Sequence, residues 1–288
     1  MRELALSFEY FPPKSIKSAF GLSNVAQQLD RLSPRFTSMT CGAGGSSQDR
    51  TIDAALALKS ATSAPVAAHI TCADQSIQDL EATINDYLAS GICEFVALRG
   101  DAPHGKTAYA PHPEGHDTVL GLIKQLALSG ARAIRVGAYP DLHPDATNLD
   151  QHIDFLARKF DAGATEAITQ FFFDIETFLR LRDRAVSRGF SDKITPGILP
   201  INNWERAKSF AKTCSIPIPL ALDRGFETAH RDGHAALYSL THTMTLCDRL
   251  IGEGVSALHL FTLNTAKHSL DICAALGKTP KSQILRAA

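Results

Sequence analysis

The sequence lacks several features that mark large classes of proteins. Its 288 residues carry no charge excess, because 29 Lys and Arg balance 30 Asp and Glu, whereas a protein held to nucleic acid by phosphate contacts needs a basic excess. No run of about 20 uncharged apolar residues could cross a bilayer. Glu3 and Glu9 come too early for a signal peptide. We therefore expect a soluble, cytoplasmic protein with no nucleic-acid or membrane partner.

Paired cysteines are also missing. The six cysteines, none in a CxxC pair, are Cys41, Cys72, Cys93, Cys214, Cys247 and Cys273. A long apolar chain without close pairs is not typical of a disulfide framework or a zinc site, so we expect core cysteines and no bound metal. His230 and His234 have the spacing of a helical metal pair, but Gly233 interrupts them and favours a solvated helix start.

Eight short β-rich runs, most of them starting about 30 residues after the one before, organise the chain. They span residues 4–11, 36–41, 66–72, 95–98, 133–138, 167–173, 195–201 and 257–263. Helical patterns follow at 46–61, 76–90, 118–129, 148–160, 175–187 and 203–213. Eight βα units predict a TIM (β/α)8 barrel of the α/β class, with residues 1–288 as one domain.

The interval between the seventh and eighth runs is about twice the usual length. It holds the helix at 203–213, a turn predicted at 217–223 and a second helix predicted at 230–253. We interpret it as one extra helix before the last strand. A doubly wound sheet is the alternative, but the GxGxxG motif that would follow its first strand is missing.

Polar residues interrupt three otherwise apolar runs at Glu9, His69 and Gln170. A charge on a barrel strand is costly unless it is paired or used. Glu9 could therefore form a salt bridge with an Arg or Lys of a neighbouring strand. Alternatively, desolvation among Phe8, Tyr10 and Phe11 could raise its pKa and make it a general acid.

The rim of the expected barrel offers little for two other chemistries. The glycine-rich stretch 42–45 could approach a phosphate or form a plain tight turn, but it is not a P-loop because no Lys-Ser or Lys-Thr follows. Lys14 is the one evident rim lysine. A Schiff-base aldolase usually needs a buried strand lysine, so that chemistry is disfavoured.

Motifs at the strand ends resemble those of the methylenetetrahydrofolate reductase family, in order and over nearly the whole chain. They are SFEYFPPK (7–14), TCGA (40–43), HITC (69–72), ALRGD (97–101), AYP with HP (138–144), AITQFFFD (167–174), PGILP (196–200) and FTLN (261–264). The resemblance implies a flavin-dependent barrel that reduces 5,10-methylenetetrahydrofolate to 5-methyltetrahydrofolate with bound FAD and, in bacterial members, NADH. The reverse oxidation would use the same residues.

The resemblance also implies residue roles. Glu9 matches the family's general acid, and Asp101 matches an aspartate near the flavin and the folate. Gln170, Phe210, Thr40 and Asp101 match substrate-binding positions. The positions that match FAD contacts are Thr40, His69, Leu98, Arg99, Gly100, Asp101, Tyr109, Tyr139, His143 and Lys159, with Asp117 a weaker candidate beside Tyr109.

The chain departs from the bacterial pattern at some positions of the expected site. These are residues 102–117, the segment 220–226, His152, Phe155, Phe261 and Thr265. The resemblance further implies a homo-oligomer without the regulatory domain of eukaryotic members. A flavin-free barrel that binds a pterin as a transferase or lyase, and a degenerate barrel kept for binding, stay open as alternatives.

Overall fold

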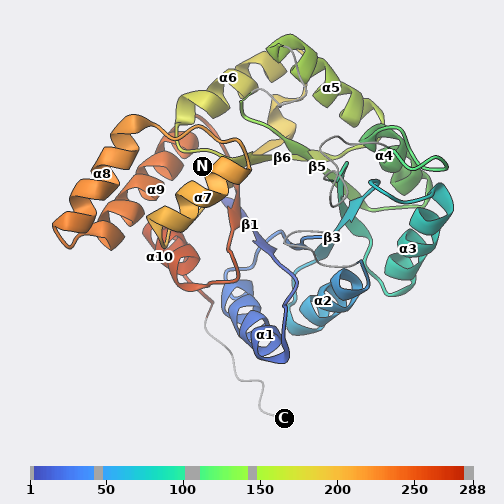
Figure 1. Ribbon diagram of the computed structural model, residues 1–288, viewed down its shortest axis with the longest axis horizontal. Coiled ribbons are helices and arrows are strands. Elements are labelled where there is room, and N and C mark those ends of the chain that lie inside the picture. The colour runs from blue at the N-terminus through green and yellow to red at the C-terminus, as the bar shows by residue number, and fades with distance from the viewer. Residues whose placement is uncertain (1–2, 42–47, 101–110, 142–147, 282–288) are drawn as a thin grey trace.

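A computed structural model describes residues 3–41, 48–100, 111–141 and 148–281 of the chain. Within these residues, eight parallel strands pair in sequence order, and the last pairs with the first to close a barrel (Figure 1). The strands are β1 (Ala5–Tyr10), β2 (Phe36–Met39), β3 (Val66–Thr71), β4 (Glu94–Leu98), β5 (Ala133–Ala138), β6 (Glu166–Phe171), β7 (Ile194–Ile198) and β8 (Ala257–Phe261). The predicted TIM barrel is confirmed, and each strand overlaps its predicted run.

The helices form an outer ring around these strands (Figure 1). They are α1 (Ile16–Asp30), α2 (Gln48–Ala61), α3 (Ile77–Ala89), α4 (Val119–Leu128), α5 (Leu149–Asp161), α6 (Ile175–Val186), α7 (Trp204–Thr213), α8 (Leu220–Arg231), α9 (Ala235–Gly252) and α10 (Lys267–Ala275). Side-chain caps define several of their starts, as where Ser76 accepts from the backbone N–H of Asp79 and begins α3. The main hydrophobic core lies between this ring and the outer face of the barrel.

Alternation along each strand decides which side chains face that core. On β1, Leu6, Phe8 and Tyr10 belong to the main core cluster. Ser7 and Glu9 lie between them, so they point into the barrel, because successive strand residues face opposite sides. A small separate cluster of Phe36, Ala67, Val96 and Ile168 fills the interior.

The segment between β7 and β8 holds more helix than the sequence predicted. The residues expected as a turn at 217–223 instead lead into α8, which begins directly after Pro219. Pro219 has φ −61° and is compatible with a helix start, so a proline that suggested a turn marks a helix start instead. Helices α8 and α9 lie side by side at the left of Figure 1.

Aromatic contacts hold α8 against α7 on one side and against α9 on the other. The rings of Trp204 and Phe226 stack with centroids 4.2 Å apart, and Tyr238 of α9 meets Phe226 edge-on. The indole N–H of Trp204 also donates to Oδ1 of Asp223 at 2.8 Å. The extra helices α8 and α9 are therefore packed against each other and against α7.

A layer of ion pairs lies at the amino-terminal ends of the strands. Arg135 on β5 donates to Glu94 on β4 at 2.9 Å and to Glu166 on β6 at 3.1 Å, and all three are buried. Arg132 and Arg35 pair with the same two carboxylates from outside. Buried charges need such pairing, and this layer closes the end of the barrel opposite the expected site.

Candidate active site

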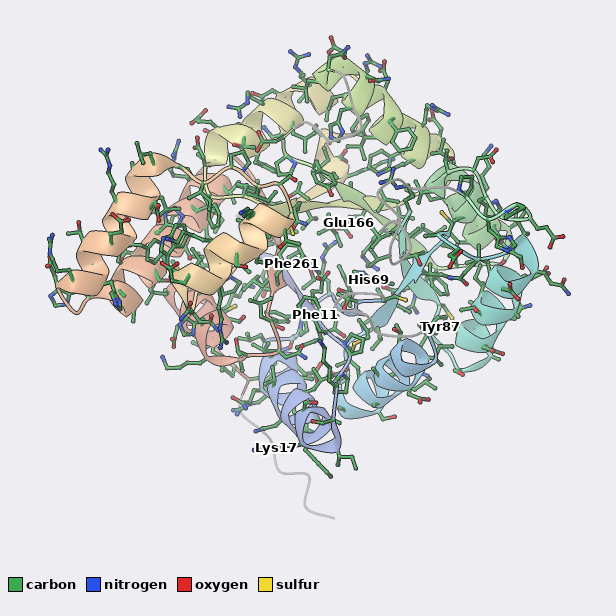
Figure 2. All side chains as sticks on the ribbon, in the orientation of Figure 1. Phe11, Lys17, His69, Tyr87, Glu166 and Phe261 are labelled. Atoms are coloured by element: carbon green, nitrogen blue, oxygen red, sulfur yellow. The ribbon has the colours of Figure 1, made fainter. Side chains whose placement is uncertain are left out.

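Glu9 lies near the carboxyl end of β1, on the inner face of the barrel, and only 8% of its surface is exposed. Its backbone pairs with Ser38 on β2 and with Phe261 on β8. Figure 2 shows Phe11, His69 and Phe261 near the centre of the ring of strands. In barrel enzymes the reacting groups gather at this end of the strands.

The carboxylate of Glu9 faces two imidazoles. Its Oε2 lies 3.4 Å from Nε2 of His69 on β3 and 3.5 Å from Nε2 of His259 on β8. Neither Nε2 atom has a closer hydrogen-bond partner among the described residues. The salt bridge with an Arg or Lys of a neighbouring strand, one of the two roles considered for Glu9, is therefore not what the described residues show.

His259 was not predicted as a site residue. It is fully buried, and its Nδ1 lies 2.8 Å from Oγ of Ser7 on the neighbouring β1. A signal was present, because His259 interrupts the apolar run 257–263 as Glu9 interrupts the first run. The sequence could not show that β8 closes against β1 in the register that places Ser7 opposite His259.

The prediction of a raised pKa for Glu9 is wrong. Burial does raise the pKa of this carboxyl, but hydrogen bonding to His259 and then to His69 outweighs burial and lowers it to about 2. A carboxylate is favoured over its neutral form when donors face it. Glu9 is therefore ionised at neutral pH unless a neighbour transfers a proton to it.

Hydrogen bonds join the carboxyl end of β1 to the residues that follow β8. The backbone N–H of Phe11 donates to Oδ1 of Asn264, and Nδ2 of Asn264 donates back to the carbonyl of Phe11, each at 2.9 Å. Thr262 donates its hydroxyl to the carbonyl of Glu9 at 2.6 Å. These bonds fix the backbone at Glu9 and just after it, which limits how far its carboxylate can move.

Several residues expected to contact FAD gather at the same end of the barrel. Thr40 is buried, and its Oγ1 has no hydrogen-bond partner among the described residues. Leu98 ends β4 and Arg99 follows it, and both are half-buried. Gly100 has φ +91°, and a Cβ there would lie 2.7 Å from Cβ of Ala73. Only glycine fits that position without strain.

Lys159 reaches this region from α5. Its Nζ donates to the carbonyl of Gly137 on β5 at 2.7 Å and lies 5.3 Å from the ring centre of Phe155. Burial, together with the charge of Arg99, lowers the pKa of Lys159 to about 8. Two cations held near each other favour an anionic group between them.

Tyr139 follows β5 at the same rim. Its carbonyl accepts a hydrogen bond from Nε2 of His152 at 3.0 Å. His152 is one of the departures from the bacterial pattern, and here it supports the backbone at the end of β5.

Three aromatic rings, those of Phe171, Phe210 and Phe261, form an aromatic wall. The ring of Phe210 on α7 stacks on Phe171 at 5.1 Å, and Phe171 meets Phe261 edge-on at 6.2 Å. Gln170 is half-buried at a point where the register of β6 against β7 shifts. Such irregularities are common beside active sites because they re-aim side chains.

Some predicted positions cannot be placed. Asp101, Tyr109 and His143 lie outside the described residues, as does the glycine-rich stretch 42–45. Asp117 is described and is exposed, as is Thr265. The structure therefore brings together Glu9, His69 and, from β8, His259, with the remaining described candidates around the rim.

A closed parallel (β/α)8 barrel with a buried carboxylate–histidine cluster at the carboxyl ends of its strands defines a barrel enzyme. The sequence profile of the family described as methylenetetrahydrofolate reductase matches residues 1–277. The chain belongs to the methylenetetrahydrofolate reductase family. The expected function, reduction of methylenetetrahydrofolate in one-carbon metabolism by an oxidoreductase, is confirmed by this membership.

Individual relatives agree with the family. The chain is 40% identical over 280 residues to 5,10-methylenetetrahydrofolate reductase of Salmonella typhimurium, covering 96% of this chain and 92% of that one. It is 39% identical over 279 residues to the Escherichia coli protein of the same name, with the same coverage. Methylenetetrahydrofolate reductase (NADH) 1 of Arabidopsis thaliana is 31% identical, and the match covers 99% of this chain but 50% of that one.

A solved structure supports the fold. An uncharacterised protein from Clostridium thermocellum, described as binding two copies of 5-methyl-5,6,7,8-tetrahydrofolic acid, superposes with a TM-score of 0.62. The superposition covers 95% of this chain and 94% of that one at 13% identity. Among the described residues, no helix is long and apolar enough to span a membrane.

Proposed function

We propose that this chain reduces 5,10-methylenetetrahydrofolate with FAD as its bound cofactor and NADH as its electron donor, and that Glu9 delivers the proton the reaction needs. The observation that carries the proposal is the position of Glu9, a buried carboxylate between two imidazoles at the active end of the barrel. Opening the folate's five-membered ring requires protonation of a ring nitrogen, which is work for a positioned acid.

The low pKa of Glu9 shapes this role. A carboxyl with a pKa of about 2 holds no proton of its own at neutral pH. The nearest groups that can hold a proton for it are Nε2 of His69 and Nε2 of His259, 3.4 and 3.5 Å from Oε2. Glu9 and its two histidines thus act together as one proton-holding unit.

Several described residues would hold FAD: Thr40, His69, Leu98, Arg99, Gly100, Tyr139 and Lys159, with Asp101, Tyr109 and His143 expected beside them. The structure fits such a group in two ways. The buried Oγ1 of Thr40 lacks a hydrogen-bond partner among the described residues. The two neighbouring positive charges of Lys159 and Arg99 suit a diphosphate. When bound, FAD supplies the hydride.

The folate would lie against the aromatic wall. The rings of Phe210, Phe171 and Phe261 present faces and edges on which a flat pterin can stack. Gln170 at the same wall carries both a donor and an acceptor in its amide, which can pair with the edge of a pterin ring. Thr40 and Asp101 complete the expected substrate contacts.

The test compares Glu9→Gln with Asp30→Asn. Asp30 is a half-buried carboxylate outside the barrel, where it accepts hydrogen bonds from Ser63 and Ala64. Anaerobic stopped-flow would follow flavin reduction by NADH and flavin reoxidation by methylenetetrahydrofolate separately. We expect Glu9→Gln to lose the folate step by about 10²- to 10⁴-fold while NADH still reduces the flavin, and Asp30→Asn to keep both steps. Normal folate turnover by Glu9→Gln would show that Glu9 is not the acid.

The same experiment distinguishes the alternatives. A colourless protein that binds folate would favour the flavin-free transferase or lyase. A flavin that only 5-methyltetrahydrofolate reduces would favour the reverse oxidation. Homo-oligomerisation and a cytoplasmic location stay predictions.

A further inference from the structure

The ring of Phe36 lies beside the imidazole of His259, deep inside the barrel. Both side chains are fully buried, and their rings stack with centroids 5.6 Å apart and planes 17° apart. Phe36 opens β2, and the register places it opposite Ser7 on β1, which is itself opposite His259 on β8. Three neighbouring strands therefore bring Phe36, Ser7 and His259 to one level of the barrel.

The orientation of the imidazole needs two constraints. Rotation about the last side-chain torsion of histidine is soft, so the ring plane and the choice between its two flipped positions must each be fixed. The hydrogen bond between Ser7 Oγ and Nδ1 of His259 selects the flip. That bond alone leaves the plane free to tilt, and Nε2 is already 3.5 Å from Glu9, at the limit of a hydrogen bond.

Phe36 is in turn held by the ion-pair layer below it. The guanidinium carbon of Arg135 lies 3.4 Å from the centre of the Phe36 ring, a close cation–π contact. The guanidinium of Arg135 is held in position, because Glu94 and Glu166 bind it from both neighbouring strands. Figure 2 labels Glu166 near the centre of the ring of strands.

We propose that Phe36 is a positioning residue for the reaction: its ring, anchored by Arg135, sets the plane of the His259 imidazole so that Nε2 points at Glu9. The proposal rests on the proposed function in that His259 serves the acid Glu9. Phe36 thereby connects the ion-pair layer at the amino-terminal ends of the strands to His259 and Glu9. Phe261, which meets His259 edge-on at 5.4 Å, closes the remaining side.

The charged and titratable groups around this stack come from five strands and the residue before β2: Glu9, Arg35, His69, Glu94, Arg135 and Glu166. Because any of them could respond to a substitution at Phe36, the test needs a readout specific to the His259 ring.

The test replaces Phe36 with Met, which fills a similar volume without a ring plane, and with Leu as a second variant. The matched control is Phe95→Leu. Phe95 is equally buried on β4, but it packs outward against Tyr87 and does not contact His259. Nitrogen NMR of histidine-labelled protein reports the tautomer of each imidazole, and the His259 signals are identified by their loss in His259→Gln.

In the unsubstituted protein we expect His259 to show one fixed tautomer. In Phe36→Met and Phe36→Leu the ring can tilt so that Nε2 turns away from the carboxylate that favours its proton. The nitrogen shifts of His259 should then move toward the average of two tautomers, and the folate step should slow by about ten- to a hundredfold. Phe95→Leu should lower the melting temperature without either effect.

Unchanged His259 shifts in folded Phe36→Met or Phe36→Leu would overturn the proposal, as would equal changes in Phe95→Leu. The NMR readout needs no turnover. A failure of Glu9 as the acid would therefore leave this result standing, and a failure here would leave the proposed function standing.

Discussion

Nε2 of His259 lies 3.5 Å from Oε2 of Glu9, and Nδ1 of the same ring lies 2.8 Å from Oγ of Ser7. When Nε2–H faces the carboxylate of Glu9, Nδ1 accepts from the hydroxyl of Ser7. Because a carboxylate only accepts, Glu9 favours a proton on Nε2, and a serine two residues before it holds the other nitrogen of the same ring. The three groups lie on two neighbouring strands whose pairing closes the barrel.

Ser7→Ala should therefore weaken the folate step selectively. A hydrogen bond of this kind is worth about 1 kcal/mol, so we expect about a fivefold loss in the rate of flavin reoxidation by folate. Reduction by NADH should not change. Ser269→Ala is the control, because Ser269 is also fully buried but its Oγ has no hydrogen-bond partner among the described residues. Equal effects of the two substitutions would contradict the role of Ser7.

Affinity for FAD should fall as the pH rises above about 8. Burial and Arg99 lower the pKa of Lys159 to about 8, so this lysine loses its charge from there upward and attracts a diphosphate less. Titration of the apoprotein with FAD between pH 6.5 and 9.5 would measure this decline. Lys159→Met should bind more weakly at pH 7 and show a flatter profile, whereas Lys159→Arg should stay charged and bind at all these pH values. An equally steep decline in Lys159→Met would exclude this lysine as its cause.

The ion-pair layer should stabilise the barrel at neutral pH but not in acid. Burial raises the pKa of Glu166, but Arg35, Thr195 and Arg135 outweigh burial and lower it overall. Because the folded pKa is depressed, the stabilisation is fully present above the unfolded pKa of about 4.3 and is lost as the pH falls further.

Glu166→Gln should accordingly lower the free energy of unfolding by about 3 kcal/mol at pH 7, since it breaks a buried pair. The difference from the unsubstituted protein should shrink below about pH 4. Urea unfolding at several pH values would show this. Glu176→Gln, which breaks an exposed pair with Arg249, should cost at most about 1 kcal/mol. A pH-independent difference for Glu166→Gln would contradict the account.

Gly197 on β7 leaves room for the aromatic wall. A Cβ there would lie 2.2 Å from the carbonyl of Thr169 and 2.5 Å from the ring of Phe261. We expect Gly197→Ala to destabilise the protein by about 2–3 kcal/mol and to displace Phe261. Gly252→Ala in α9, where nothing lies within 4 Å of the new Cβ, should be neutral or slightly stabilising. Thermal unfolding of both variants is the measurement, and equal melting temperatures would show that the barrel yields at Gly197.

The barrel was predictable because its strands are largely apolar runs, most of them at a similar spacing, which local sequence reveals. The helix α8 was not, because Pro217 and Pro219 suggest a turn, and only the stacking of Phe226 on Trp204 shows what the following residues pack against. Glu9 was predictable as a charge on an apolar strand. Its lowered pKa was not, because the pKa depends on His69 and His259, which only the closed barrel brings to the same oxygen.

The most direct test of the central claim is the visible spectrum of the purified protein, recorded without oxygen before and after addition of NADH and then of methylenetetrahydrofolate. The account predicts a flavin spectrum that NADH bleaches and that the folate restores. A protein that shows no flavin spectrum, even after incubation with FAD, would contradict it.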